Sequence, residues 1–237
     1  ALACTAALPA VAQNQAQEVV DPNEPVSVVN YRTTSYAQPD ALLYDNGQLI
    51  NSIGTGVGGA DESILQSTSL GHTVLGFGFA VSSGFRMSDD FTGTDPGGWQ
   101  IDDITFFSYQ TGGGIPSTIN DVRVQIWDGD PSNPASSVVF GDTATNRLAS
   151  TTWTNAYRVS ETTTGGSSAR AIMDVVATIN TVLPAGTYWV DVNIGGTAAS
   201  GPWAPPVTIT GQAVTGDSQQ WNPTTMLWGP ATHGNGD

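Results

Sequence analysis

Hydrophobic and polar residues alternate along several short stretches of the chain, as they do in β-strands that bury one face. In residues 122–127, valine and isoleucine alternate with polar side chains and Trp127, and residues 186–194 repeat this pattern. Residues 99–106 are also rich in aromatic and β-branched side chains, which favour strands. These three stretches are predicted to form the centre of one sandwich.

Two details predict local irregularities in the strands. The adjacent Asp102 and Asp103 interrupt the alternation around them, which indicates a β-bulge or a change of face. In residues 72–81, Gly76 and Gly78 occupy alternate positions among large apolar side chains. A strand that carries glycine on one face is expected where another backbone crosses it closely.

Weaker signals of the same kind continue along the rest of the chain. Further short strands are predicted at residues 26–31, 136–140, 148–153, 156–159, 171–181, 207–210 and 221–228. Residues 45–47 (Asp-Asn-Gly) lie between apolar flanks and predict a hairpin, whereas residues 86–98 have the composition of an acidic loop. Strand signals at intervals of roughly ten residues predict an all-β fold. We expect a single antiparallel, jelly-roll-like β-sandwich over residues 26–237, preceded by an extended N-terminal segment of residues 1–25.

The first twelve residues are alanine-rich, apolar and uncharged, and the polar residues 13–25 that follow have the composition of a linker. Three interpretations stay open: the tail of a signal peptide cleaved after Ala12, a lipidation site at Cys4, and a strand that docks on a neighbouring subunit. An apolar chain end is usually disordered unless something ties it down, which favours the docked strand.

Composition narrows the range of partners. Only 11% of the residues are charged, the net charge is -15, and the six basic residues are scattered arginines. An acidic field without a basic patch argues against nucleic acids and anionic membranes as partners. No apolar run has the length of a membrane span, so no membrane insertion is expected. The polar but uncharged surface composition predicts a secreted, extracellular or cell-surface protein.

Few residues are suited to catalysis. The two histidines, His72 and His233, are the only candidate bases, and no nucleophile elbow accompanies them. Both are expected to be ordinary surface residues. Two histidines and one distant cysteine are too few for a zinc site, and the glycine-rich residues 54–59 lack the Lys-Ser/Thr of a phosphate-binding loop. We therefore expect a non-enzymatic protein without catalytic residues or a resident cofactor.

One loop offers oxygen ligands for calcium. Asp128, Asp130 and Asn133 are spaced like the start of an EF-hand loop, but the glycine at the sixth place is missing and Val139 replaces the final ligand. The alternative is an Asx-rich hairpin turn. The threonines of residues 162–164 are candidate positions for O-linked glycans.

Three tryptophans are candidates for an interaction surface. Trp127 and Trp189 lie opposite the aliphatic faces of their strands, and Trp203 lies in the proline-rich residues 201–206. Because the outer face of a two-layer sandwich is normally polar, tryptophans there need a cover. That cover is either a ligand such as a sugar, or protein from other strands or a neighbouring subunit.

Six segments together carry a resemblance to known proteins: GGWQIDDITFF, VRVQIWDGDPSNP, RLASTTW, YRVSETT, LPAGTYWVDV and SGPWAPP. In these segments the chain resembles a family of uncharacterised secreted bacterial β-sandwich surface proteins, over residues 40–230. The resemblance implies one further apolar strand after residues 229–230, so that this sandwich is a strand short. A sandwich of that kind with an apolar N-terminal segment resembles, by architecture, the donor-strand-assembled subunits of extracellular fibres.

The first functional hypothesis is therefore a structural subunit that polymerises head-to-tail into a helical extracellular homopolymer. Its N-terminal segment is expected to complete the sheet of the next subunit. The side chains expected to dock are Leu2, Leu8 and Val11, or Val19, Val20 and Val26 if the mature chain begins at Gln13. The alternative is a monomeric secreted carbohydrate-binding or adhesive protein that uses Trp127, Trp189 or Trp203.

Overall fold

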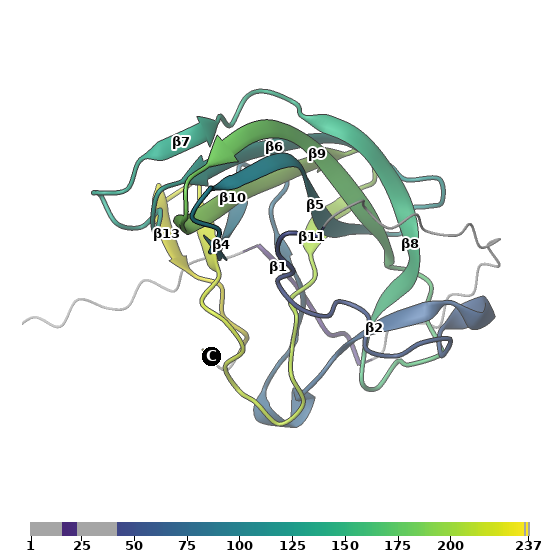
Figure 1. Cartoon of the computed structure of the whole chain (residues 1–237). Coiled ribbons are helices and arrows are strands. Elements are labelled where there is room, and N and C mark those ends of the chain that lie inside the picture. Colours follow the sequence, from purple (N-terminus) through teal and green to yellow (C-terminus); the bar gives the residue numbers. More distant parts are fainter. Residues whose placement is uncertain (1–15, 23–41, 235, 237) are drawn as a thin grey trace, which may run out of the picture.

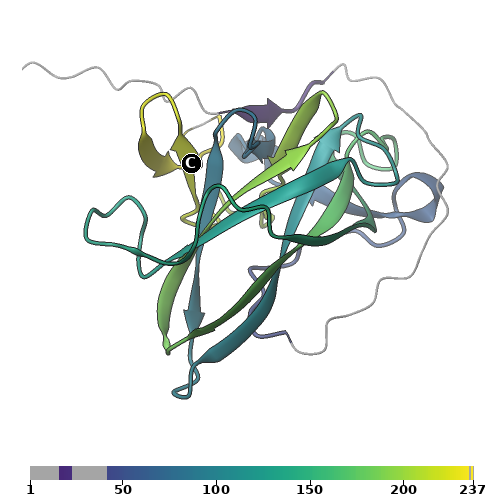
Figure 2. The same ribbon diagram turned by 90° about the horizontal axis from the view of Figure 1, so that it is seen from above.

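The computed structural model describes residues 16–22, 42–234 and 236. These residues form two β-sheets packed face to face, which confirms the all-β sandwich (Figures 1 and 2). The strands are β1 (Gln17–Val19), β2 (Asp61–Leu65), β3 (Val74–Gly78), β4 (Arg86–Gly93), β5 (Trp99–Thr111), β6 (Ile119–Trp127), β7 (Val138–Gly141), β8 (Leu148–Ser160), β9 (Ala171–Leu183), β10 (Gly186–Gly196), β11 (Ser200–Ala204), β12 (Gln219–Asn222) and β13 (Leu227–Pro230). Two single 3₁₀ turns, Val57–Gly59 and Thr68–Leu70, are the helical elements of the described chain.

The strand order differs between the two sheets. The seven-stranded sheet runs β1-β3-β11-β5-β9-β8-β2, and the six-stranded sheet runs β13-β12-β4-β10-β6-β7. Neighbouring strands are antiparallel except for β2 and β8, which pair in parallel. The predicted antiparallel sandwich is thus confirmed, with this one parallel pair as the exception among the described strands. Parallel pairing is possible there because a long connection joins the two strands.

The three stretches predicted to lie at the centre do so, in two layers. In the six-stranded sheet β6 and β10 are neighbours, with Val124 opposite Val192, while β5 lies in the other sheet beside β9. The register of β5 shifts between Ile101 and Asp103, which confirms the bulge. The inward faces of the two sheets form the main core, including Val122, Val124, Ile126, Val175, Ala177 and Ile194.

The glycines of β3 are crossed closely by neighbouring residues, as predicted. A Cβ atom on Gly78 would lie 2.5 Å from the Cβ of Ala16 and 3.0 Å from its carbonyl oxygen. A Cβ atom on Gly76 would lie 2.7 Å from the Cβ of Trp203. The N-terminal segment therefore lies directly against this glycine face.

Several local predictions were wrong. The expected acidic loop at residues 86–98 begins with strand β4, whose Met87 and Phe91 are buried. Residues 42–50 contain no strand, although the Asp45 carboxylate accepts the Gly47 amide in the predicted turn (3.0 Å). Residues 207–210 are likewise not a strand, and the strands β2 and β11 had no clear alternating pattern. These outcomes depend on pairing with strands distant in sequence. The predicted strand at residues 26–31 lies outside the described residues.

Candidate functional site

The first candidate site is the edge of the seven-stranded sheet, where β1 pairs with β3. The residues that hold β1 there, Gly76, Gly78, Thr111, Arg170 and Gln220, are called the β1 groove. Gln17 and Glu18 lie opposite Phe77 and Gly76, and the Gly78 amide donates to the Ala16 carbonyl (2.6 Å). Gln220 reinforces this ladder from the other sheet, because its side-chain amide donates to the carbonyls of Ala16 (3.1 Å) and Gly78 (2.7 Å). The groove thus fixes both the path and the register of the strand.

Glu18 carries the charge of this contact. Its carboxylate lies 3.0 Å from Arg170, and the two side chains are only 12% and 5% exposed. The Thr111 hydroxyl also donates to the Glu18 carboxylate. Burial raises the pKa of the neighbouring Tyr109 well above its usual value, and the charge of Glu18 raises it further. The Glu18 carboxylate is therefore largely shielded from water and is held by side chains of the sandwich body.

A second arginine lies close to this pair. Arg158 is 1% exposed and donates to the Leu75 carbonyl (3.0 Å), the Ser63 hydroxyl (2.9 Å) and the Pro206 carbonyl (3.0 Å). The pKa of Arg158 is lowered to about 10, chiefly by burial. The charge of Arg170 contributes to this lowering, whereas Tyr109 and Glu18 oppose it. The groove carries buried positive charge that the carboxylate of β1 compensates.

The side chains predicted to dock on a neighbouring subunit are not the ones that make the close contacts of β1. Val19 is 55% exposed and Val20 is half-buried, whereas Ala16 and Glu18 make the close contacts. Leu2, Leu8, Val11 and Val26 lie outside the described residues. Glu18 was not predicted, although one local signal marks it, because it is the first charged residue of the chain.

The second candidate site is the outer face of the six-stranded sheet. Trp127 and Trp189 are cross-strand partners there, which places them on the predicted face. Trp189 is only 7% exposed, and Trp127 is half-buried. Toward the other edge, Trp221 and Trp228 meet edge to face at 5.6 Å between ring centroids. This second pair was not predicted. Residues 221–228 were expected to be one strand, whereas Trp221 and Trp228 face each other across the β12–β13 hairpin.

Polar groups lie between the two tryptophan pairs. Arg86 stacks on Trp221 and Trp228, with its guanidinium carbon 4.7 and 5.1 Å from their ring centroids. Arg86 also forms an ion pair with Asp191 (3.4 Å), which is 1% exposed. Burial raises the pKa of Asp191 to about 7, although Arg86 and a hydrogen bond from the Trp127 indole (3.4 Å) oppose this shift. The outer face therefore has a buried polar centre between aromatic flanks.

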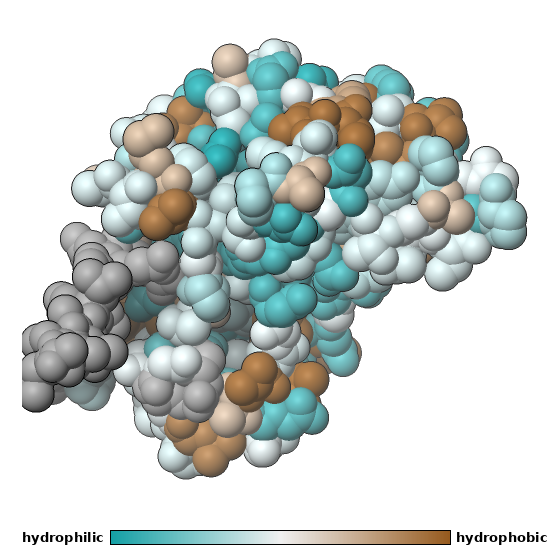
Figure 3. Space-filling view, turned by 90° about the vertical axis from the view of Figure 1, so that its left-hand side faces the viewer, coloured by the Kyte–Doolittle hydropathy of each residue, from teal (hydrophilic) through white to brown (hydrophobic). Residues whose placement is uncertain are grey.

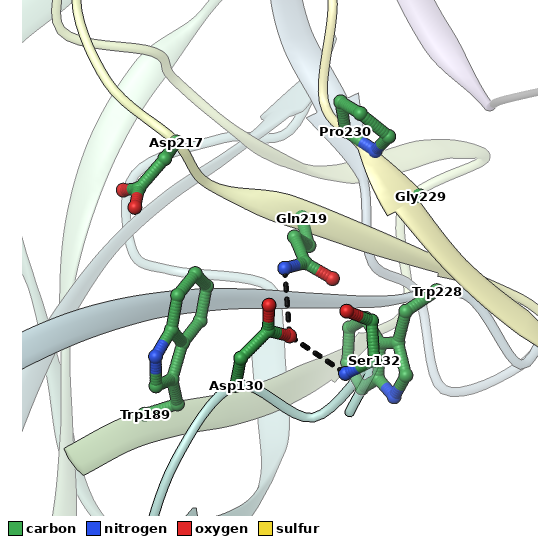
Figure 4. A pocket seen from close by; sticks show the side chains of 8 residues that line it. All are labelled: Asp130, Ser132, Trp189, Asp217, Gln219, Trp228, Gly229 and Pro230. Carbon is green, nitrogen blue, oxygen red and sulfur yellow. Dashed lines mark hydrogen bonds between the residues drawn. The ribbon is translucent and has the colours of Figure 1, made fainter. Parts of the chain in front are cut away.

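A pocket of about 350 Å³ opens beside this centre. Its lining residues are Asp130, Ser132, Trp189, Asp217, Gln219, Trp228, Gly229 and Pro230 (Figure 4). The Asp130 carboxylate accepts hydrogen bonds from the Gln219 side-chain amide (2.8 Å) and the Ser132 backbone amide (2.7 Å). In Figure 4 this carboxylate lies between Trp189 and Trp228. The β6–β7 loop and the β12–β13 hairpin thus form one recess.

The loop considered for calcium adopts turns stabilised by its own side chains. Asp130 and Asn133 accept the backbone amides of Ser132 (2.7 Å) and Ala135 (3.0 Å), as in Asx turns. Asp128 accepts the Ser137 amide (2.6 Å) across the loop. Burial tends to raise the pKa of Asp130, but hydrogen bonds from Ser132 and Gln219 outweigh it and lower the pKa. Calcium binding at this loop stays a prediction.

A different acidic group is closer together in space. The carboxylates of Asp89, Asp90 and Asp217 come within 4.8 Å of one another. Burial raises the pKa of Asp89 and of Asp90, and hydrogen bonds from Asn46 and the Asp90 amide partly offset the shift at Asp89. Sequence spacing could not show this grouping, because Asp217 is distant from the other two.

The histidines are not surface residues, so that prediction was wrong. His72 is fully buried and His233 is 8% exposed, and their rings stack at 4.1 Å. His72 makes hydrogen bonds to the carbonyls of Gln66 (3.2 Å) and Ala213 (2.6 Å), and His233 accepts the Val74 amide (3.2 Å). Burial lowers the pKa of His233 to about 4, and the charges of His72 and Arg158 add to that effect. Their contacts join the C-terminal segment to β3.

Trp203 lies apart from the other tryptophans. It belongs to β11 of the seven-stranded sheet, not to a loop, and it packs over Gly76. Its indole donates to the Ser200 hydroxyl (3.3 Å). The structure therefore separates Trp203 from Trp127 and Trp189, which the sequence had grouped together.

The fold and the two sites define an all-β sandwich with an N-terminal edge strand. No protein-family model, no curated protein and no solved structure matches the chain. The resemblance to secreted surface proteins accordingly stays a prediction. Among the described residues, no helix is both long and apolar enough to span a membrane.

Proposed function

We propose that this protein is a non-enzymatic structural subunit of a secreted extracellular filament, and that subunits assemble by exchanging the N-terminal strand. One observation carries the proposal: the body of the sandwich offers a groove whose buried Arg170 is matched by Glu18 of β1. A charge-matched groove for a terminal strand is the arrangement that β-augmentation uses, with backbone hydrogen bonds for affinity and side chains for register.

The length of the covalent connection sets the reach of β1. Residues 23–41 join β1 to the sandwich body, and a fully extended chain of that length spans at most roughly 65 Å. In the described chain β1 fills the groove of its own body. The same contacts form when β1 comes from a second copy. A head-to-tail exchange yields a filament when the rotation between successive copies does not close into a ring.

One face of the molecule is consistent with association through a strand rather than through a broad apolar interface. On the face shown in Figure 3, hydrophobic side chains form separate patches among polar residues. Stable subunit contacts usually need a large buried area or an unpaired sheet edge. The edge of β3 that holds β1 supplies the second of these when β1 is withdrawn from it.

A charge-swap experiment tests whether the strand is exchanged. Glu18→Arg and Arg170→Glu each place like charges in the groove, so neither variant alone is expected to form filaments. When the two variants are mixed, the unchanged Glu18 of one chain meets the unchanged Arg170 of the other, and the two replaced residues meet with opposite charges. Negative-stain microscopy and light scattering are expected to show filaments in the mixture only.

Two controls make the result decisive. The double variant Glu18→Arg/Arg170→Glu restores the opposite charges and is expected to assemble alone. A chain lacking residues 1–17, which removes Leu2, Leu8 and Val11, is expected to form few filaments and to melt at a lower temperature. Monomeric wild-type protein at high concentration, or a mixture that stays monomeric while the double variant assembles, would contradict strand exchange.

A further inference from the structure

The pocket on the outer face of the six-stranded sheet has no part in strand exchange. It lies between the β6–β7 loop and the β12–β13 hairpin, whereas the β1 groove lies at the edge of the other sheet. Its volume of about 350 Å³ falls in the range of small-molecule sites. A ligand is therefore expected to bind this pocket in a single subunit as well as in an assembled filament.

The lining combines aromatic surface with both donors and acceptors. Trp189 and Trp228 supply the aromatic walls, and the Asp130 carboxylate lies between them in Figure 4. Asp217 adds a second acceptor, and the Ser132 hydroxyl both donates and accepts. Sugar rings present C–H faces that stack on indoles and hydroxyl groups that donate and accept hydrogen bonds. The lining matches that chemistry.

The polar residues of the pocket are held in place. Gln219 is 9% exposed, and its amide is fixed by the hydrogen bond to Asp130. Asp130 in turn is fixed by the Ser132 backbone amide. On the far side, Arg86 stacks on Trp228 at 5.1 Å and orients its ring. Preorganised groups of this kind lose little conformational entropy when a ligand binds.

The negative charge of the pocket determines which hydroxylated ligands it can bind. The pocket is lined by two carboxylates, Asp130 and Asp217, and the chain as a whole carries a net charge of -15. Both features repel anionic sugars such as uronic acids. A simple cation would need acceptors only, whereas this lining also offers hydroxyl donation. Neutral sugars remain as the best match.

We propose that this pocket binds a neutral oligosaccharide, with Trp228 as the stacking surface, the largely buried Trp189 as an apolar wall, and Asp130, Ser132 and Asp217 as hydroxyl partners. This assigns the carbohydrate-binding function predicted from the sequence to a site that excludes Trp203. It also shifts the stacking residue to Trp228, because Trp127 does not line the pocket.

Calorimetric titration of the full chain with maltohexaose, cellohexaose and xylohexaose tests this proposal, with oligogalacturonate and chitosan hexamer as charged probes. At least one neutral hexasaccharide is expected to bind at one site per chain and to change tryptophan fluorescence. Trp228→Ala and Asp217→Ala are each expected to weaken binding at least tenfold. Asp217 is exposed, so its variant is expected to keep the wild-type melting temperature.

The controls separate this proposal from filament assembly. Trp203→Phe, in the other sheet, is expected to bind like wild type. Glu18→Arg, which is impaired in strand exchange, is expected to bind with wild-type affinity. Absence of binding to all three neutral sugars at 10 mM, binding of chitosan alone, or unchanged binding by both pocket variants would overturn the proposal.

Discussion

At the scale of single residues, the main feature is a carboxylate on a terminal strand that is largely shielded from water. Glu18 faces Arg170 at 3.0 Å with both side chains almost excluded from water. Removing one partner of a buried ion pair leaves the other charge without compensation, which costs far more than losing a surface pair. The groove is therefore expected to accept only a strand that places a negative charge opposite Arg170.

The first prediction concerns this pair. Glu18→Gln keeps the shape of the side chain but removes its charge, so the free energy of unfolding is expected to fall by about 3 kcal/mol. Urea unfolding measures the change. Asp102→Asn, on an exposed carboxylate, is the matched control and is expected to change stability little. An equal, small effect of both substitutions would show that Glu18 and Arg170 are not a buried pair.

The second prediction concerns pH and Asp191. Its pKa is raised from 3.8 to about 7, so between these values the folded protein holds a proton that the unfolded chain has released. The stability due to this group is therefore present at low pH and is lost as pH rises from about 4 to 7. The melting temperature of wild type minus that of Asp191→Asn is expected to fall by several degrees over this range.

Comparison with one variant isolates Asp191 from other titrating groups. Asp174, whose pKa burial raises to about 6, acts in the same direction, whereas His233, with a lowered pKa, loses its contribution as pH falls. Both remain in Asp191→Asn and cancel in the difference. A constant difference across the range would mean that Asp191 is ionised in the folded protein throughout.

At the scale of elements, β1 is short but tightly specified. Its three ladder residues are held by β3, by Gln220 of the six-stranded sheet and by the ion pair of Glu18. The absence of a side chain at Gly78 lets Ala16 approach the strand. The glycine is thus required by the neighbouring backbone and not by the conformation of β3 itself.

The third prediction follows from this approach. Gly78→Ala would place a methyl group 2.5 Å from the Cβ of Ala16, so β1 is expected to leave the groove. Hydrogen exchange at residues 16–20 is expected to become fast, and filament yield is expected to drop. Gly114→Ala is the matched control, because nothing lies within 4 Å of its added Cβ. Slow exchange in Gly78→Ala would show that the strand tolerates the methyl group.

At the scale of the whole molecule, strand exchange couples stability to concentration. A strand supplied by a second copy stabilises the fold by mass action, whereas a strand from the same chain does so independently of concentration. The two arrangements share every contact of the groove and differ in this dependence.

The fourth prediction uses that difference. Dilution of the wild-type protein over two orders of magnitude is expected to lower its melting temperature and to shorten the filaments. The melting temperature of Glu18→Arg, whose strand does not dock, is expected to stay constant. Calorimetry with light scattering measures both. A wild-type melting temperature that does not change with dilution would assign β1 to its own chain.

The sequence by itself determined the strands whose residues alternate. The patterns of β6 and β10, the bulge at Asp102 and the glycine face of β3 follow from local side-chain periodicity, and so does the outward position of Trp127 and Trp189. These features depend on residues that are neighbours along the chain. For that reason a single sequence was enough to predict them.

Tertiary structure alone decided which distant residues meet. Strand β4 lacks a clear pattern, and it forms because β10 and β12 supply hydrogen bonds on both of its sides. The pairing of Glu18 with Arg170, the burial of both histidines and the pocket between Trp189 and Trp228 join segments far apart in sequence. These three features form because other strands shield the side chains from water and supply their partners. The periodicity of neighbouring residues does not predict which distant strands do so.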